Sequence, residues 1–156
     1  MYILNLHKEQ FIDKPIEEVF KFFENPNNLE KITPSHLQFK ILSNCPKTMI
    51  KGLTINYQIK LFKVPFKWKT VIKHYNPPHM FIDEQIKGPY KKWVHTHSFK
   101  SKGGGTLICD KVEYIIPLGI FGYLLNFIWI KYELNRIFNY RRYVIDSYFN
   151  KNGELI

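Results

Sequence analysis

A long alternation of apolar and polar residues fills the middle of the chain and limits its possible folds more than any other feature. Between positions 36 and 117, hydrophobic side chains recur at every second residue, which is the period of strands that bury one face. Groups rich in glycine, proline, asparagine or lysine interrupt this pattern at 46–52, 63–65, 76–78, 88–89 and 102–105. Six strands fit between the interruptions, and their short connections predict an antiparallel meander closed around an interior.

A strand and two short helices are expected before this region. Positions 2–12 are typical of a first strand, and Pro15 then favours the start of a helix. The apolar residues that follow have the spacing of one buried helical stripe: Ile16, Val19, Phe20 and Phe23. A second short helix is predicted over 27–32, because Asn25 and Pro26 are favourable residues where a helix begins.

A long helix is expected after the alternating region. Beyond Pro117 the apolar period returns to 3.6 residues, and no glycine or proline occurs from 123 to 151. This stretch predicts a helix of about 29 residues, roughly 43 Å long. Such a helix must lie across most of the sheet, which is an α+β arrangement of layers. The 156 residues have the size of one domain, so we expect a single domain over 1–156.

Short motifs on the predicted strands add to this order of elements. They are Phe81-Ile82-Asp83-Glu84-Gln85, Gly88-Pro89-Tyr90, Trp93-x-His95-x-His97-x-Phe99, Asp110-x-Val112-x-Tyr114 and Pro117-x-Gly119. Motifs and element order together resemble the helix-grip fold of the START and Bet v 1-like (SRPBCC) superfamily, in its bacterial ligand-binding branch related to polyketide cyclases and coenzyme Q-binding proteins. The resemblance implies a curved antiparallel sheet of about seven strands wrapped around the long helix. It also implies a cavity between sheet and helix for a hydrophobic or amphipathic small molecule or a lipid.

The residues expected to line this cavity alternate along the strands. Trp93, His95, His97 and Phe99 share one face of a strand, and Asp110 and Tyr114 share one face of the next. The tryptophan and the phenylalanine favour burial of this face. The predicted ligand-binding residues are Tyr57, Phe66, Trp68, Phe81, Trp93, His95, His97, Phe99, Asp110, Tyr114 and Phe138.

Two interpretations apply to the polar members of this set. A hairpin turn at 102–105 brings His95 opposite or diagonal to Asp110. The favoured interpretation is a buried hydrogen-bonded pair that forms the polar end of a binding cavity. The alternative is a cyclase or dehydratase in which His95 is the base and Asp110 orients it. The sequence does not decide which of Asp83, Glu84 and Gln85 face inward, since a shift of one residue in the strand register exchanges the inward and outward side chains.

Metal, cofactor and nucleic-acid binding are not expected. His95-x-His97 has the spacing of two zinc ligands, but no third ligand is fixed by the sequence. The net charge of +10 comes mainly from scattered lysines, with arginine only at 136, 141 and 142, whereas phosphate and base recognition favours arginine. Two isolated cysteines and the lack of a signal-peptide pattern indicate a cytoplasmic protein with free thiols.

The segment Leu118 to Ile130 has apolar side chains on every helical face. The first expectation is that they pack against the short helices and the mouth of the cavity, because large apolar patches are normally buried. The alternatives are a gate that makes peripheral contact with a membrane, as in a lipid or quinone carrier, and the interface of a homodimer.

Overall fold

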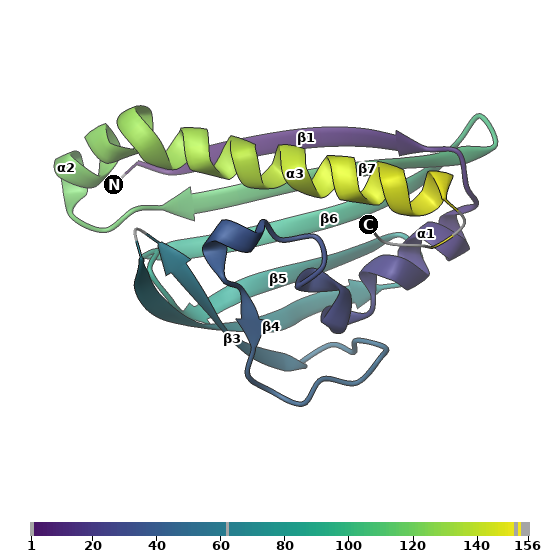
Figure 1. Ribbon diagram of the computed structural model, residues 1–156, viewed down its shortest axis with the longest axis horizontal. Coiled ribbons are helices and arrows are strands. Elements are labelled where there is room, and N and C mark those ends of the chain that lie inside the picture. The colour runs from purple at the N-terminus through teal and green to yellow at the C-terminus, as the bar shows by residue number, and fades with distance from the viewer. Residues whose placement is uncertain (1, 62, 152, 154–156) are drawn as a thin grey trace.

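A seven-stranded antiparallel sheet curves around one long helical segment in the computed structural model, which describes residues 2–61, 63–151 and 153 (Figure 1). The strand order is β1-β7-β6-β5-β4-β3-β2. The elements are β1 (Leu4–Ile12), α1 (Ile16–Phe23), the 3₁₀ turns η1 (Pro26–Leu29) and η2 (Ser35–Leu37), β2 (Lys40–Ile41), β3 (Thr54–Leu61), β4 (Val64–Asn76), β5 (Met80–Lys87), β6 (Lys92–Lys102), β7 (Gly105–Ile115), α2 (Gly119–Leu125), the π-helical segment η3 (Asn126–Ile130) and α3 (Lys131–Asn150). The predicted α+β helix-grip fold is confirmed.

The six strands expected after the short helices are present, but the first of them is very short. β2 spans only Lys40–Ile41, and the turn η2 occupies the positions just before it. The prediction that alternation begins at His36 is therefore wrong for this stretch. Gln38 ends η2 in the left-handed backbone region, which stops a strand from starting there.

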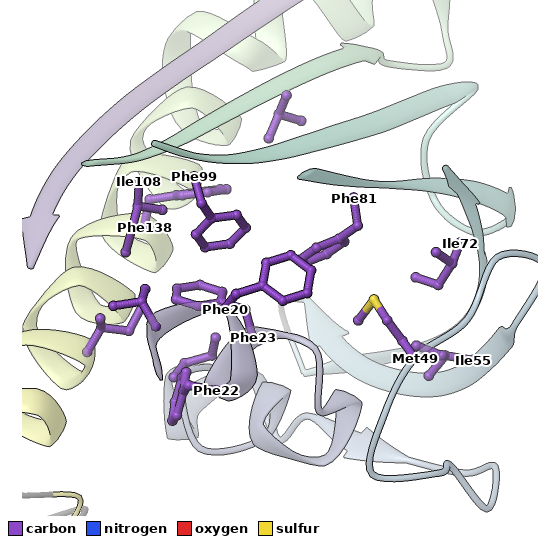
Figure 2. Packing of buried hydrophobic residues seen from close by; sticks show 14 of the residues in the cluster. Phe20, Phe22, Phe23, Met49, Ile55, Ile72, Phe81, Phe99, Ile108 and Phe138 are labelled. Atoms are coloured by element: carbon purple, nitrogen blue, oxygen red, sulfur yellow. The ribbon is translucent and has the colours of Figure 1, made fainter. Parts of the chain in front are cut away.

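Helix α1 closes one end of the sheet with a cluster of aromatic rings (Figure 2). Glu17 and Glu18 lie in its first turn, where their charges favour the positive end of the helix dipole. The rings of Phe20 and Phe23 lie 5.2 and 5.1 Å from the ring of Phe99, which comes from β6. These contacts make one end of the interior a solid aromatic core.

The C-terminal helical segment begins at Gly119, four residues before the predicted position 123. Leu118 and Gly119 both have positive φ angles, so the chain turns sharply out of β7. A Cβ atom at Gly122 would lie 2.0 Å from the carbonyl oxygen of Pro117, so only glycine permits this close approach. The π-helical segment then directs Asn126 inward, where its Oδ1 accepts a hydrogen bond of 2.8 Å from the Tyr114 hydroxyl.

Helix α3 crosses in front of the sheet and buries one side against it (Figure 1). Its buried residues recur with helical spacing and are Glu133, Leu134, Phe138, Arg141, Ile145 and Phe149. An acid and an arginine thus share the face of α3 that meets the interior.

The apolar segment from Leu118 to Ile130 is mostly exposed, so the expectation that it packs against the short helices and the mouth of the cavity is wrong for most of its residues. Trp129 and Ile130 are half-buried and line the cavity between the sheet and α3. Phe121 and Ile128 are 71% and 78% exposed. Its other exposed apolar residues are Leu118, Ile120, Leu124, Leu125 and Phe127. The reason is the position of α2, which lies beyond the end of β7 (Figure 1), so that Gly122 and Asn126 are the buried residues of α2 and η3.

Candidate functional site

A cavity of about 390 Å³ lies between the sheet and α3. Its walls come from β3, β4, β5 and β6 of the sheet, from η3 and α3, and from α1 and the two 3₁₀ turns η1 and η2 with the residues between them. Eight of the predicted binding residues line it: Tyr57, Phe66, Trp68, Phe81, Trp93, His95, His97 and Phe138. The side chains that alternate on these strands therefore meet in one space, as their period of two requires.

Three predicted lining residues lie outside the cavity wall. Phe99 is covered by α1, so its ring belongs to the solid core. Tyr114 is covered by η3 through its hydrogen bond to Asn126. Asp110 lies behind the two histidines, which separate it from the cavity. The prediction chose the correct strand faces but did not include the helices that cover both ends of those faces.

The polar end of the cavity is a network of two histidines and two aspartates. His95 Nε2 donates to Asp110 Oδ1 at 2.8 Å, and His97 Nε2 donates to Asp83 Oδ2 at 2.9 Å. In the register of the sheet, His97 is directly opposite Asp110 and His95 is directly opposite Asp83, so both hydrogen bonds run diagonally. The expected cross-strand contact between His95 and Asp110 is present.

Each histidine of the network is also close to the second aspartate. His97 Nδ1 lies 3.0 Å from Asp110 Oδ1, although this contact is not aligned as a hydrogen bond. His95 Nδ1 lies 3.8 Å from Asp83 Oδ2, and the two imidazole rings are 3.6 Å apart. All four side chains are largely buried, so water screens their charges weakly.

The packing of this network lowers the pKa values of the two aspartates and shifts the pKa values of the two histidines in opposite directions. Burial raises the pKa of Asp83 and of Asp110, but hydrogen bonds from the histidines and nearby positive charges outweigh burial and lower both pKa values overall. Burial and the neighbouring His97 lower the pKa of His95. Burial acts in the same sense on His97, yet its contacts with both aspartates raise its pKa overall. The network therefore favours two carboxylates, an imidazolium at His97 and a neutral imidazole at His95.

The same side chains have the composition of a divalent metal site. Ligand atoms of Asp83, His95 and His97 lie within 4.8 Å of one another, and two imidazoles with one carboxylate are zinc ligands in many proteins. In the structure the Nε2 atoms of His95 and His97 each hydrogen-bond to an aspartate, which satisfies them without an ion, whereas His97 Nδ1 is buried without a hydrogen bond.

Asp83 and Arg141 are candidate site residues that the sequence analysis did not select. Both line the cavity. The ambiguity of register concealed Asp83, whereas Phe81 on the same strand face was already predicted to point inward. Arg141 falls on the helix side that also carries Phe138 and Ile145, and this charge within an apolar stripe was a signal that could have identified it.

Comparisons with solved structures support the fold. The crystal structure of TTHA0849 from Thermus thermophilus matches with a TM-score of 0.74 at 13% identity, over 97% of this chain and 100% of that one. The di-domain ARO/CYC StfQ from the steffimycin biosynthetic pathway matches with a TM-score of 0.72 at 9% identity, over 96% of this chain and 52% of that one. Ara h 8.0201 matches with a TM-score of 0.61 at 13% identity, over 94% and 99% of the two chains.

No protein-family model and no curated protein matches the amino-acid sequence of this chain. Its likeness to Ara h 8.0201 and to the aromatase/cyclase is a likeness of fold, with an antiparallel sheet curved around a long C-terminal helix. The chain has the helix-grip fold, as these solved structures do.

Proposed function

We propose that the protein binds an amphipathic small molecule between its sheet and α3. The observation that carries this proposal is the cavity of about 390 Å³, whose wall is mainly aromatic and aliphatic and includes the polar cluster of Asp83, His95 and His97. Ligand sites in proteins commonly combine a large apolar wall with a few fixed polar groups. The apolar wall supplies affinity, and the network of His95, His97 and Asp83 orients a polar group of the ligand.

The volume of the cavity limits the size of this ligand. Pockets that bind small molecules have volumes of about 300–1,000 Å³, and this cavity lies near the lower end of that range. A single acyl chain or a small ring system fits this volume, and a phospholipid with two chains does not fit completely inside. We therefore propose a ligand with one apolar body.

Native mass spectrometry of the purified protein, with extraction by organic solvent, tests this proposal. Ile137 lines the cavity from α3, and Ile137→Trp fills part of the space. Asn139 is exposed on the same helix, so Asn139→Trp is the matched control. We expect an apolar ligand bound to the wild type and to the control but lost from Ile137→Trp. Equal loading of all three proteins would contradict the proposed site.

A catalytic role of the cyclase or dehydratase type is the second candidate, and the opposed pKa shifts favour it. Neighbouring groups whose pKa values are driven apart can serve as an acid and a base at one pH. In this role neutral His95 takes a proton from the substrate and His97 donates one. We expect His95→Gln to abolish turnover of a polyketide-like substrate while the circular dichroism spectrum stays unchanged. Unaltered turnover would remove His95 from this role.

Contact with a membrane surface is the third candidate, and the exposed apolar segment favours it. Leu118 and Leu125 are exposed and also line the cavity, so this surface continues into the binding space. Among the described residues, none of the helices is both long and apolar enough to span a bilayer. We propose a cytoplasmic protein that takes up its ligand at an anionic membrane surface through this segment. Association of two copies through the same segment is the competing arrangement.

A further inference from the structure

Arg141 is a cation in an unusual position, on the buried side of α3 and in the wall of the cavity. Its side chain is 8% exposed, and its guanidinium carbon lies 4.9 Å from the ring centroid of Phe138. Within the described part of the chain, it forms no salt bridge and no hydrogen bond to any acceptor, and its Nε is enclosed without a partner. A buried charge without a partner is unfavourable, so arginines in protein interiors are normally paired.

The nearby aspartates do not supply that partner. Asp83 accepts from His97, and Asp110 accepts from His95. No carboxylate oxygen of the described residues lies within salt-bridge distance, 4.0 Å, of Arg141, although its charge helps to lower the pKa of Asp83. The contact with Phe138 provides a cation–π attraction but no hydrogen-bond acceptor. The planar donor fork of the guanidinium therefore has no acceptor among the described residues, and a ligand in the cavity can supply one.

The hydroxyl group of Tyr57 is a second donor on the same wall. Tyr57 lines the cavity, and among the described residues its hydroxyl has no hydrogen-bond partner. Burial raises the pKa of Tyr57 well above its ordinary value, so the hydroxyl keeps its proton. The charge of Asp83 raises this pKa further and the charge of Arg141 lowers it, so all three groups lie within electrostatic reach of one another.

We propose that Arg141, with Tyr57, binds the carboxylate of a ligand that is otherwise apolar. A guanidinium presents two parallel N–H groups that match the two oxygens of a carboxylate, and this pairing is strongest where water is excluded. The aromatic wall formed by Trp68 and Trp93 then receives the apolar body of the ligand. Neutral His95 can accept a proton when the ligand adds a negative charge. This inference rests on the proposed binding function and specifies the chemical class of the ligand.

Decanoate and 1-decanol are the probes that test the inference, because they share an apolar chain and differ in the head group. Binding to the wild type, Arg141→Gln, Arg141→Lys and Arg142→Gln is measured at pH 7.5 through tryptophan fluorescence and calorimetry. Arg142 is exposed on the same helix and is the matched control. We expect the wild type and the control to bind decanoate at least about tenfold more tightly than decanol, the size of a hydrogen bond to a charged group.

The variants at Arg141 separate recognition from folding. We expect Arg141→Gln to bind decanoate and decanol about equally, with decanol affinity unchanged, and Arg141→Lys to keep part of the preference. The melting temperature of Arg141→Gln is expected not to fall, since the substitution removes an unpaired buried charge. Retention of the full decanoate preference in Arg141→Gln would overturn the inference, as would a lower melting temperature with no change in preference. If neither probe binds the wild type, the proposed binding function itself fails.

Discussion

Asp83, His95, His97 and Asp110 act as one ionic unit, because each histidine approaches both aspartates. Buried ion pairs of this kind add little to stability over apolar packing, but the removal of one partner leaves a charge without compensation. The ionised form of each side chain in the network is therefore stabilised by the other members. Its stability must respond to pH through the histidines as well as through the aspartates.

The substitution Asp110→Asn tests this coupling. The lowered pKa of Asp110 means that its contribution is present above the unfolded value of about 3.9 and is lost as pH falls through the folded value. The raised pKa of His97 means that its contribution is complete below about 6.5 and is lost as pH rises through the folded value. At pH 6 both charges are present, so we expect Asp110→Asn to reduce the free energy of unfolding by about 3 kcal/mol.

Urea denaturation at pH 6 and pH 9 measures the effect of this substitution. The loss is expected to be smaller at pH 9, where His97 carries less charge. Asp13→Asn serves as the control, since Asp13 is exposed and its substitution is expected to change stability by less than about 0.5 kcal/mol. A loss that is identical at the two pH values would show that His97 and Asp110 are not coupled.

For individual residues, the sequence predicted which strand faces point inward better than it predicted which charged residues lie beside the two histidines. The period of two placed His95 and His97 on the correct face without any knowledge of the sheet. Asp83 depended on the pairing of β5 with β6, and a single sequence does not fix that register. The open donor fork of Arg141 depends on atoms from three elements, so no local pattern reveals it.

Among the elements, α2 and η3 are the least expected part of the fold. Their apolar side chains form a surface at the end of the sheet where β7 finishes, and the hairpin between β3 and β4 and the loop between β5 and β6 lie at this same end. Exposed lysines accompany them at Lys63, Lys87, Lys91 and Lys131. An apolar surface bordered by positive charge is complementary to a membrane with anionic lipids.

Co-sedimentation with vesicles of phosphatidylglycerol and phosphatidylcholine at low salt tests this surface. We expect the wild type to sediment and the double variant Phe121→Ser/Ile128→Ser to stay largely in solution, because it removes two of the most exposed apolar side chains. Tyr143→Ser is the control, since Tyr143 is 63% exposed on α3 outside this segment. Absence of vesicle binding, together with a dimer in sedimentation velocity that the double variant abolishes, would instead identify a homodimer interface.

The strands and the long helix were predictable because their hydrophobic periods are long and regular. The exposure of α2 was not predictable, because it depends on where β7 ends relative to the rest of the sheet. The early start of the helical segment has a similar cause. The prediction counted the helix from position 123, after the last glycine, whereas Gly119 supports the turn before the helix and Gly122 permits close contact with Pro117.

For the molecule as a whole, a ligand bound in the cavity is expected to increase the free energy of unfolding. A ligand that binds only the folded state stabilises it by about 2.7 kcal/mol at a concentration 100 times its dissociation constant. For a chain of this size we expect decanoate at that concentration to raise the melting temperature by roughly 5–10 °C. Ile137→Trp is expected to show little shift, because the added ring occupies the cavity. Equal shifts in both proteins, measured by scanning calorimetry, would place decanoate elsewhere.

The pairing of β1 with β7 also determines how this sheet can be made during synthesis. Lys8 of β1 lies opposite Asp110 of β7, so about 100 further residues must be synthesised before β1 can pair. The hairpins from β3 to β7, in contrast, join strands that are neighbours in the sequence. Until β1 docks, β7 presents an open edge of unpaired backbone groups to other chains in the cell. A nascent chain of this protein is therefore most vulnerable to strand exchange and aggregation in the interval between completion of β7 and the return of β1.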